Sequence, residues 1–438
     1  MKILVIGSGA REHAIVKALE KSPKQKSIYC FGTTVNPGIA QLCRQYFVVD
    51  LGDCDEIVTK AKTLGIELVI IGPEAPLEMG LADRFWEIDI PVIGPKKALA
   101  QIETSKEFAR DLMKKYQISG LPRYQKFTSL EKVDSFLQEL GEGNYVIKAN
   151  GLMGGKGVKV AGEHLHSMAE AKRFCQEILA KRQTFIIEEK LIGQEFSFMC
   201  FADGKTLSPM PLVQDHKRAY NGDLGPNTGG MGSYSDINHS LPFLTTAEKD
   251  EAFTINKAVF DALMEECKEP YIGILYGSFI ATQKGIYVIE FNARFGDPEA
   301  LNVLALLESD FLSLCEAMIG GTLAEEKLSF AKQATVCKYA VPEGYPDSPM
   351  KNFVVDFSAV KDQKNLFLGS VHKIDHMILA TGSRTAACVG VADTLSQAEQ
   401  KAEDEINLID GPLFHREDIG TEKLINHRIE HMTRLRKT

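Results

Sequence analysis

Short apolar runs that end in glycine alternate with helical patterns over the first hundred residues of this chain. The runs are KILVIG, SIYCFG, ELVIIG and PVIGP, and stretches such as REHAIVKALEKS and DEIVTKAKTLG separate them. This alternation predicts a parallel sheet with helices on both faces. Ligands of such sheets bind beyond the carboxyl ends of the strands. We therefore expect a crevice lined by the glycines at those ends, which are Gly7, Gly9, Gly32, Gly72 and Gly94.

The rest of the chain mixes strands and helices and is mostly strand-like over its last hundred residues. One helix is expected over residues 98–116 and another over about 246–268. Between them, residues 215–236 are polar and glycine-rich and are expected to form a long loop, a kind of segment that is often functional. A domain boundary is expected near residue 330, and the basic tail after Ile425 is expected to be a solvated helix without a clear role.

Length, charge and cysteine usage restrict the class of protein. At 438 residues the chain is too long for one ordinary core, so about three domains are expected. The net charge of −9 argues against general nucleic-acid binding. No apolar run reaches the ~18 residues of a membrane span. The nine cysteines are scattered, odd in number and without a CxxC pair, which favours reduced thiols and a cytoplasmic location. We expect a monomer that acts on small molecules.

A glycine-rich stretch, VIKANGLMGGKGVKV over residues 146–160, lies between two apolar strand patterns and carries Lys148 and Lys156. It is not a P-loop, because its glycines are one residue too close, no Ser or Thr follows the lysine, and a strand rather than a helix comes next. Glycines allow backbone amides to approach phosphate oxygens. The stretch therefore suggests a mobile hairpin lid over a triphosphate, and the alternative is an ordinary hairpin with solvated lysines.

Two later strands carry oxygen-rich side chains. FIIEEKLIGQEFSF offers a strand edge for adenine and carboxylates for ribose hydroxyls, although acidic residues after a strand are often only solvated. In VIEFNARFGDPEA, Glu290 and Asn292 are two apart and face the same side of a strand. Both supply oxygen ligands suited to Mg²⁺ that bridges phosphates, and Arg294 could hold a carboxylate or phosphate with its planar fork. The alternative is a polar outer face of the strand.

Eight motifs occur in an order that resembles the ATP-grasp fold, and most closely the phosphoribosylamine–glycine ligase (glycinamide ribonucleotide synthetase) family. They are GSGAREHA (7–14), IGPEAPL (71–77), IGPKKALAQIETSK (93–106), VIKANGLMGGKGV (146–158), EEKLIGQEFS (188–197), QDHKRAYNGDLGPNTGGMGSYS (214–235), EFNARFGDPE (290–299) and FHREDIG (414–420). The resemblance covers nearly the whole chain. It implies an α/β protein with a Rossmann-like domain over 1–103, an ATP-grasp domain over 104–330 with a mobile lid subdomain over about 124–194, and a small β-rich domain with a closing helix over 331–438.

The resemblance also implies an activity, namely ATP-dependent joining of glycine to 5-phosphoribosylamine through glycyl phosphate in purine biosynthesis, with Mg²⁺ or Mn²⁺. The implied catalytic residues are Lys148, Asp215 and Arg294, and the implied metal ligands are Glu290 and Asn292. The implied ATP-binding residues are Lys106, Lys148, Gly154, Gly155, Lys156, Gly157, Glu188, Glu189, Leu191 and Glu195. The implied substrate-binding residues are Gly9, Asn36, Pro37, Gly38, Pro73, Glu74, Asp215, Arg294, Gly296 and Asp297.

The chain departs from the family pattern at Ala10, where glycine is usual, at Asn150, where an aspartate is usual, and at Met153–Gly154, where two alanines are usual. None of these changes removes an implied metal or phosphate ligand. A nicotinamide oxidoreductase is disfavoured, because Glu12 replaces the third glycine of GxGxxG and no acid ends the second strand. Another ATP-grasp ligase would differ in its substrate preference. A catalytically dead relative would be expected to lack Glu290, Asn292 or Lys148.

Overall fold

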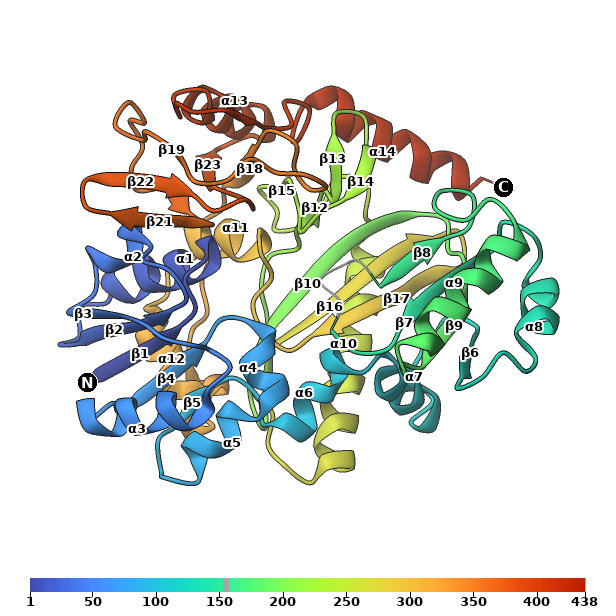
Figure 1. Cartoon of the computed structure of the whole chain (residues 1–438), viewed down its shortest axis with the longest axis horizontal. Helices are drawn as coiled ribbons and strands as arrows, with labels where there is room; N and C mark the ends of the chain where they lie inside the picture. The colour runs from blue at the N-terminus through green and yellow to red at the C-terminus, as the bar shows by residue number, and fades with distance from the viewer. Residues whose placement is uncertain (153–156, 438) are drawn as a thin grey trace.

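The computed structural model describes residues 1–152 and 157–437 (Figure 1). Its amino-terminal sheet is entirely parallel, with strand order β3-β2-β1-β4-β5, which confirms the predicted parallel sheet. The order changes direction between β1 and β4, the place where open parallel sheets bind ligands. The strands and the helices that connect them are β1 (Lys2–Ile6), α1 (Ala10–Glu20), β2 (Ser27–Gly32), α2 (Pro37–Ala40), β3 (Gln45–Val48), α3 (Cys54–Leu64), β4 (Leu68–Ile71), α4 (Glu74–Met79), α5 (Leu81–Trp86) and β5 (Val92–Ile93).

The helix expected over residues 98–116 is two helices, α6 (Lys97–Thr104) and α7 (Lys106–Lys115). The break falls at Ser105, whose backbone is extended and whose hydroxyl accepts from the Phe108 amide, so it caps the start of α7. Periodicity alone does not reveal this interruption, because both helices bury the same kind of apolar residue. The consequence is that Lys106 stands in the first turn of a helix.

Two antiparallel sheets follow, and Figure 1 shows both on the side of the molecule away from the amino-terminal sheet. The smaller unit has sheet order β6-β9-β7-β8 and a separate apolar core, and we call it the lid subdomain. The larger sheet has order β11-β10-β16-β17 and packs against the long helix α10, which confirms the helix expected over 246–268. The elements are β6 (Tyr124–Phe127), α8 (Val133–Leu140), β7 (Tyr145–Ala149), β8 (Val158–Val160), α9 (Met168–Ala180), β9 (Phe185–Glu189), β10 (Gln194–Asp203), β11 (Leu207–Pro209), α10 (Thr246–Cys267), β16 (Ile272–Thr282) and β17 (Gly285–Asn292).

The segment expected as a long loop at 215–236 instead contains four short strands. β12 and β15 pair with each other, and β15 pairs with β18, so this segment forms part of the sheet β12-β15-β18-β23-β20 of the carboxyl-terminal region. β13 and β14 form a separate hairpin. The sequence does not predict these strands, because each is only two to four residues long and the segment is rich in glycine and polar residues. They are β12 (Gln214–Asp215), β13 (Arg218–Tyr220), β14 (Leu224–Asn227) and β15 (Gly232–Ser235).

The remaining elements complete the carboxyl-terminal region and the link into it. The closing helix α13 packs on β18 and β23. The tail after Ile425 is helical as expected, but it is not solvated all round, because Ile425 and Met432 are buried. The elements are α11 (Glu299–Leu306), α12 (Phe311–Gly320), η1 (Leu323–Glu325), β18 (Ala334–Pro342), β19 (Phe353–Val354), β20 (Leu366–Leu368), β21 (Val371–Ile374), β22 (Met377–Ala380), β23 (Ala386–Ala392), α13 (Leu395–Ile406), β24 (Leu413–Phe414) and α14 (Glu422–Leu435).

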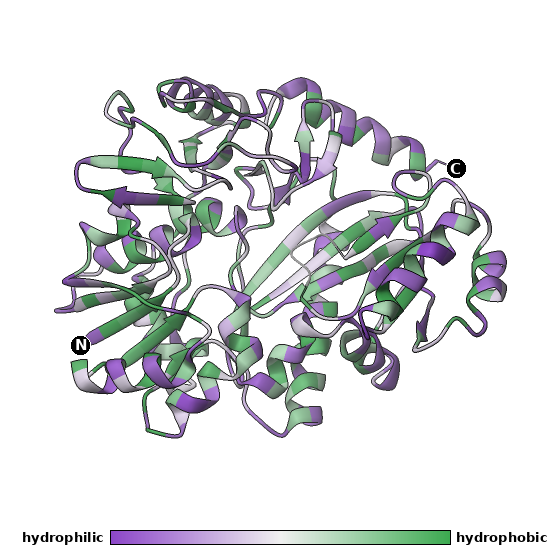
Figure 2. Ribbon diagram, viewed as in Figure 1, coloured by the Kyte–Doolittle hydropathy of each residue, from purple (hydrophilic) through white to green (hydrophobic). Residues whose placement is uncertain are grey.

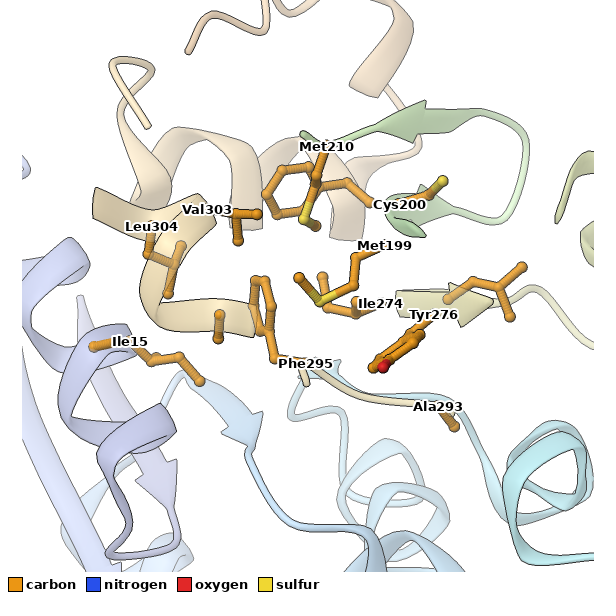
Figure 3. Close-up of a cluster of buried hydrophobic side chains, with 14 of the residues drawn as sticks. Ile15, Met199, Cys200, Met210, Ile274, Tyr276, Ala293, Phe295, Val303 and Leu304 are labelled. Carbon is orange, nitrogen blue, oxygen red and sulfur yellow. The ribbon is translucent and has the colours of Figure 1, made fainter. Parts of the chain in front are cut away.

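One apolar core joins the amino-terminal sheet to the larger antiparallel sheet. Figure 3 shows Ile15 of α1 near Leu304 of α11, with Phe295 and the β10 side chain Met199 continuing the cluster. Figure 2 shows that apolar residues concentrate in the strands of the amino-terminal sheet, whereas the outer helix α14 is largely hydrophilic. All nine cysteines are free and none is exposed, as the sequence predicts. Among the described residues, no helix is long and apolar enough to cross a membrane.

Candidate active site

A cavity of about 140 Å³ lies between the lid subdomain, helices α6 and α7, and strand β17. It brings together six of the residues predicted for the site, from four separate parts of the chain. Those six are Glu74, Lys106, Lys148, Glu290, Asn292 and Arg294. The predicted residues Glu189, Leu191 and Glu195 are not among its described lining. Met153, Gly154, Gly155 and Lys156 lie outside the described residues.

Glu188 joins two cations beside this cavity. Its carboxylate lies 2.5 Å from Arg110 Nε and 2.7 Å from Lys148 Nζ, and all three side chains are almost fully buried. Burial alone would raise the pKa of Glu188, but the charges of Arg110 and Lys148 outweigh it, and the pKa lies below its ordinary value. A buried carboxylate that stays ionised between two cations fixes both of them in place.

A β-bulge in β17 shapes the floor of the cavity. Ser278 pairs with Glu290 and Phe279 with Val288, which leaves Ile289 as the extra residue on β17. Its carbonyl accepts from Lys148 Nζ at 2.9 Å and from Arg110 at 2.7 Å. The same two cations therefore hold the lid sheet against β17.

Glu290 and Asn292 both line the cavity, as their spacing on one strand predicts. Burial acts to raise the pKa of Glu290, yet it lies below the ordinary value because Lys217, Lys106, Lys148 and Arg294 surround the carboxylate. An ionised carboxylate beside an amide oxygen is the donor set with which Mg²⁺ binds when substrate phosphates complete its shell. In the described part of the chain, no group of three or more acidic, histidine or cysteine side chains is arranged so that it could hold a metal ion.

Lys106 and Asn150 tie the start of α7 to the glycine-rich stretch. Lys106 Nζ donates to the Gly151 carbonyl at 2.9 Å, and burial lowers the pKa of Lys106. The Asn150 side-chain oxygen lies 3.3 Å from Ser105 Oγ and accepts from the Glu107 amide at 3.4 Å. The Asn150 side chain thus meets the amino-terminal end of α7 with a neutral amide oxygen.

Arg294 links this cavity to the amino-terminal crevice. It lies 2.8 Å from Glu103 and 3.3 Å from Glu74, the first residue of α4. Burial opposes its charge, but Glu103 and Glu74 outweigh burial and raise the pKa of Arg294. Arg294 Nε forms an ion pair with Glu74 but makes no hydrogen bond. The guanidinium of Arg294 therefore lies between carboxylates of α6 and α4, at the junction of the cavity and the amino-terminal crevice.

A second polar cluster adjoins Glu290 and centres on Asp215 and Lys217. One carboxylate oxygen of Asp215 is buried without a hydrogen-bond partner, and burial together with Glu299 raises the pKa of Asp215 well above its ordinary value. Burial disfavours the charge of Lys217, but Glu195, Glu290, Asp215 and Glu299 raise its pKa. Lys217 Nζ lies 3.6 Å from Glu195. The sequence prediction missed Lys217, although it stands two residues after Asp215 in the same motif.

The predicted substrate residues of the amino-terminal domain surround the carboxyl ends of β1, β2 and β4. The Gly9 amide donates to Glu12 at 2.7 Å. Asn36 is fully buried, caps α2, and donates to the carbonyls of Ser8 and Leu368, so its side chain already has partners within the protein. Pro37, Gly38 and Pro73 lie in the same helix starts and contribute backbone.

Gly296 and Asp297 lie between this crevice and the carboxyl-terminal region. Asp297 accepts from Tyr339 Oη at 2.5 Å and lies 3.2 Å from Arg384. Arg384 also donates to the carbonyls of Gly229 and Asp297, both at 2.8 Å. The sequence prediction missed Arg384, because no spacing pattern connects it to residues about ninety positions earlier.

Three profiles of one family match the chain in order. Residues 1–103 match the N domain of phosphoribosylglycinamide synthetase, residues 104–300 its ATP-grasp (A) domain, and residues 335–422 its C domain. Phosphoribosylamine–glycine ligases of Methanosarcina barkeri and Methanosarcina acetivorans are each 47% identical to this chain over 436 residues, which cover 100% of this chain and 100% and 98% of those proteins. A crystal structure of phosphoribosylamine–glycine ligase from Thermotoga maritima matches with a TM-score of 0.80 at 26% identity, covering 95% of this chain and 100% of that one.

The matched A domain, together with a cation-lined cavity between two antiparallel sheets, defines this chain as an ATP-grasp protein. Within that class, the identity to full-length relatives and the three matched domains place it further. The chain belongs to the phosphoribosylglycinamide synthetase family.

Proposed function

We propose that this protein joins the carboxyl group of glycine to the amino group of 5-phosphoribosylamine at the cost of ATP, as the names of its relatives describe. A glycine carboxylate oxygen attacks the γ-phosphorus and ADP leaves, which gives glycyl phosphate. The amine nitrogen of the sugar then attacks the acyl carbon, phosphate leaves and a proton is released. The products are glycinamide ribonucleotide, ADP and phosphate, so the protein serves purine biosynthesis.

The observation that carries this proposal is the central cavity, whose lining places the Glu290 carboxylate together with three cations, Lys106, Lys148 and Arg294. Phosphoryl transfer needs positioned positive charge more than covalent chemistry from the protein. Lys106 and Lys148 are in place to hold the phosphates, because their ammonium groups are fixed by the Gly151 and Ile289 carbonyls. Lys217 supplies a further positive charge that acts on Glu290.

Glu290 and Asn292 would hold Mg²⁺ or Mn²⁺ together with the ATP phosphates. A divalent cation at this place supplies charge that neutralises the phosphate oxygens during transfer. Glu188 keeps Lys148 oriented, and with Glu189, Leu191 and Glu195 it belongs to the proposed nucleoside subsite. The predicted lid residues 154–157 would cover the phosphates.

Glycine would lie between Asp215 and Arg294. The unpartnered Asp215 oxygen suits the ammonium of glycine, and the Arg294 fork suits its carboxylate. Gly9, the segment 36–38, Pro73 and Glu74 would hold the phosphoribosylamine, with Gly296 and Asp297 between the two substrates. Arg294 contacts Glu74, so the two substrate sites share one ion pair.

The test is ADP release by the purified protein with MgATP, glycine and freshly generated phosphoribosylamine, with each component omitted in turn. Release that requires all three supports the proposal. Release that ignores glycine but responds to another amino or carboxylic acid would assign the chain to a different ATP-grasp reaction. The monomeric state and the cytoplasmic location stay predictions from the sequence.

A further inference from the structure

The carboxyl-terminal helix α14, for which the sequence predicts no role, reaches two segments of the proposed active site. Figure 1 shows it running along one side of the molecule, from the β13–β14 hairpin toward the start of β10. Two of its side chains form buried or half-buried polar contacts there, His431 with Gln194 and Arg428 with Asp223. Both partners lie close in sequence to proposed site residues.

The first route runs from His431 to the Glu195 backbone. Gln194 Nε2 lies 2.7 Å from His431 Nδ1, and because an amide nitrogen only donates, the histidine nitrogen accepts. The other end of the Gln194 amide accepts from Gln214 Nε2 at 3.5 Å, and this nitrogen also donates to the Glu195 carbonyl at 2.9 Å. Tyr234 Oη donates to the Gln214 side-chain oxygen at 2.8 Å.

Both glutamines on this route are buried, with exposed fractions of 6% for Gln194 and 3% for Gln214. A buried amide that loses its partner bears the full cost of desolvation, so it would move to find another partner. Gln214 donates a hydrogen bond to the Glu195 carbonyl and is joined to Asp215 by a peptide bond. A movement of Gln214 would therefore displace both Glu195 and Asp215.

The second route runs from Arg428 to the backbone just after Lys217. Asp223 accepts from Arg428 and, at 3.0 Å, from Arg416. Arg416 is fully buried and also donates to the Arg218 carbonyl at 3.1 Å. Lys217 is the residue before Arg218, so these bonds fix its main chain from the carboxyl side.

The tip of the same hairpin is held as well. The Gly222 amide donates to Asp418 at 2.8 Å, and Asp418 in turn accepts from the Arg416 guanidinium at 2.8 and 2.9 Å. Arg416 and Asp418 belong to the FHREDIG motif, which the sequence prediction recorded without assigning it a role. The motif and α14 therefore both form hydrogen bonds with the β13–β14 hairpin.

We propose that α14 is a positioning element of the active site, with His431 setting the nucleotide side through Gln194 and Gln214, and Arg428 setting the glycine side through Asp223 and the β13–β14 hairpin. The inference rests on the proposed function in assigning Glu195 to ATP and Asp215 to glycine. The two routes enter the segment 214–218 from opposite ends, so they predict different kinetic consequences.

The test compares His431→Phe and Arg428→Met with the intact protein by steady-state kinetics. His431→Phe is expected to raise the apparent KM for ATP about threefold to tenfold, with a smaller change for glycine. Arg428→Met is expected to show the reverse, a larger rise for glycine than for ATP. His431→Asn, which places an amide oxygen near the position of Nδ1, should restore the KM for ATP.

Matched controls lie on the same helix. His427→Phe and Arg434→Met change exposed residues of the same types and should leave both KM values unchanged. If α14 were only a stabilising helix, the two test variants would lower the unfolding midpoint and the active fraction while both KM values stayed within twofold of the intact protein. That outcome would overturn the proposal, as would failure of His431→Asn to differ from His431→Phe.

Amide hydrogen exchange separates this inference from the proposed function. Both test variants should speed exchange across residues 214–223 in the absence of any substrate, relative to the control variants. If exchange accelerates as expected but the intact protein does not release ADP with glycine, the positioning role of α14 is supported and the proposed function fails. Unchanged exchange in residues 214–223 would refute the positioning role of α14, whatever reaction the protein catalyses.

Discussion

The ammonium of Lys148 lies 2.7 Å from a carboxylate oxygen of Glu188 on the neighbouring strand of the lid sheet. In the register of that sheet Val146 faces Glu188 and Lys148 faces Ile186, so the ion pair runs diagonally between β7 and β9. Because Arg110 takes the other carboxylate oxygen, Glu188 cannot turn away from Lys148 without leaving a buried cation unpaired. The pair therefore fixes a lysine that the proposed reaction needs beside the triphosphate.

Glu188→Gln should destabilise the fold. The side chain keeps its shape but loses the charge that compensates two buried cations, and breaking such a pair costs about 3–5 kcal/mol. Urea unfolding should show a lower midpoint with an unchanged slope. Glu177→Gln, at an exposed position of α9 in the same subdomain, should change the free energy of unfolding by less than about 0.5 kcal/mol. An equal midpoint for the two variants would show that Glu188 is not needed to compensate Arg110 and Lys148.

Stability should also depend on pH through Glu188. Its pKa is lowered by folding, so the stability it contributes is fully present above the unfolded value of about 4.3 and is lost as pH falls through the lower folded value. The difference in unfolding free energy between the intact protein and Glu188→Gln should therefore be constant near neutrality and shrink below about pH 4. A difference that shrinks between pH 6 and 8 would assign the effect to another group.

Glu290→Gln should abolish most ADP release at ordinary Mg²⁺ concentration. The change removes a negative charge that lies among Lys106, Lys148, Lys217 and Arg294, and with it the proposed metal ligand. Loss of such charge stabilisation costs about 10²–10³-fold in turnover. The measurement is a Mg²⁺ titration of ADP release, which should show a weaker apparent metal affinity. Near-normal turnover at ordinary Mg²⁺ would remove Glu290 from the metal site.

Much of this site was predictable from the sequence, because its residues come from strand ends and from motifs whose spacing fixes the side they face. Glu290 and Asn292 share a strand face, and Lys148 lies at the end of β7 before the glycine-rich stretch, both as expected. The bulge at Ile289 was not predictable, since no proline or glycine marks it. Without it, the carbonyl that orients Lys148 and Arg110 would be engaged in the sheet.

The parts that the sequence could not supply depend on contacts between distant segments. β12 and β15 are too short to show a period. β15 forms a strand by pairing with β18, about a hundred residues later, and β12 pairs with β15 in turn. Arg384 reaches Asp297 for the same reason, through the packing of the carboxyl-terminal sheet on the loop after β17. Ser105 divides one expected helix into two because its side chain caps α7.

Arg294→Lys should weaken glycine binding more than ATP binding. Lysine keeps a charge near Glu103 and Glu74, so both carboxylates stay compensated, but it lacks the planar fork that would meet a further carboxylate. We expect the apparent KM for glycine to rise about tenfold, a loss of about 1.4 kcal/mol, with the KM for ATP changed less than twofold. Equal rises in both KM values would instead indicate that Arg294 contacts phosphate. Arg294→Met would be less informative, because it leaves the buried Glu103 carboxylate without its counter-charge and should destabilise the fold.

Asp215→Asn should make the protein more stable and less active. Folding raises the pKa of Asp215, chiefly by burial and then by the nearby Glu299, so the folded state prefers the protonated form. Stability from this group is therefore greatest below the unfolded pKa of about 3.9 and is lost as pH rises through the folded value. Asparagine has no charge to bury, so the variant should have a higher urea midpoint at pH 8, and the difference should narrow toward pH 4.

Because the ionised carboxylate is the proposed partner of the glycine ammonium, kcat/KM of the Asp215→Asn variant for glycine should fall at least a hundredfold. The acid limb of the pH–rate profile that this group produces in the intact protein should also disappear. A variant that is less stable at pH 8, or one that keeps glycine-dependent ADP release, would show that Asp215 is a structural carboxylate rather than the residue that receives glycine.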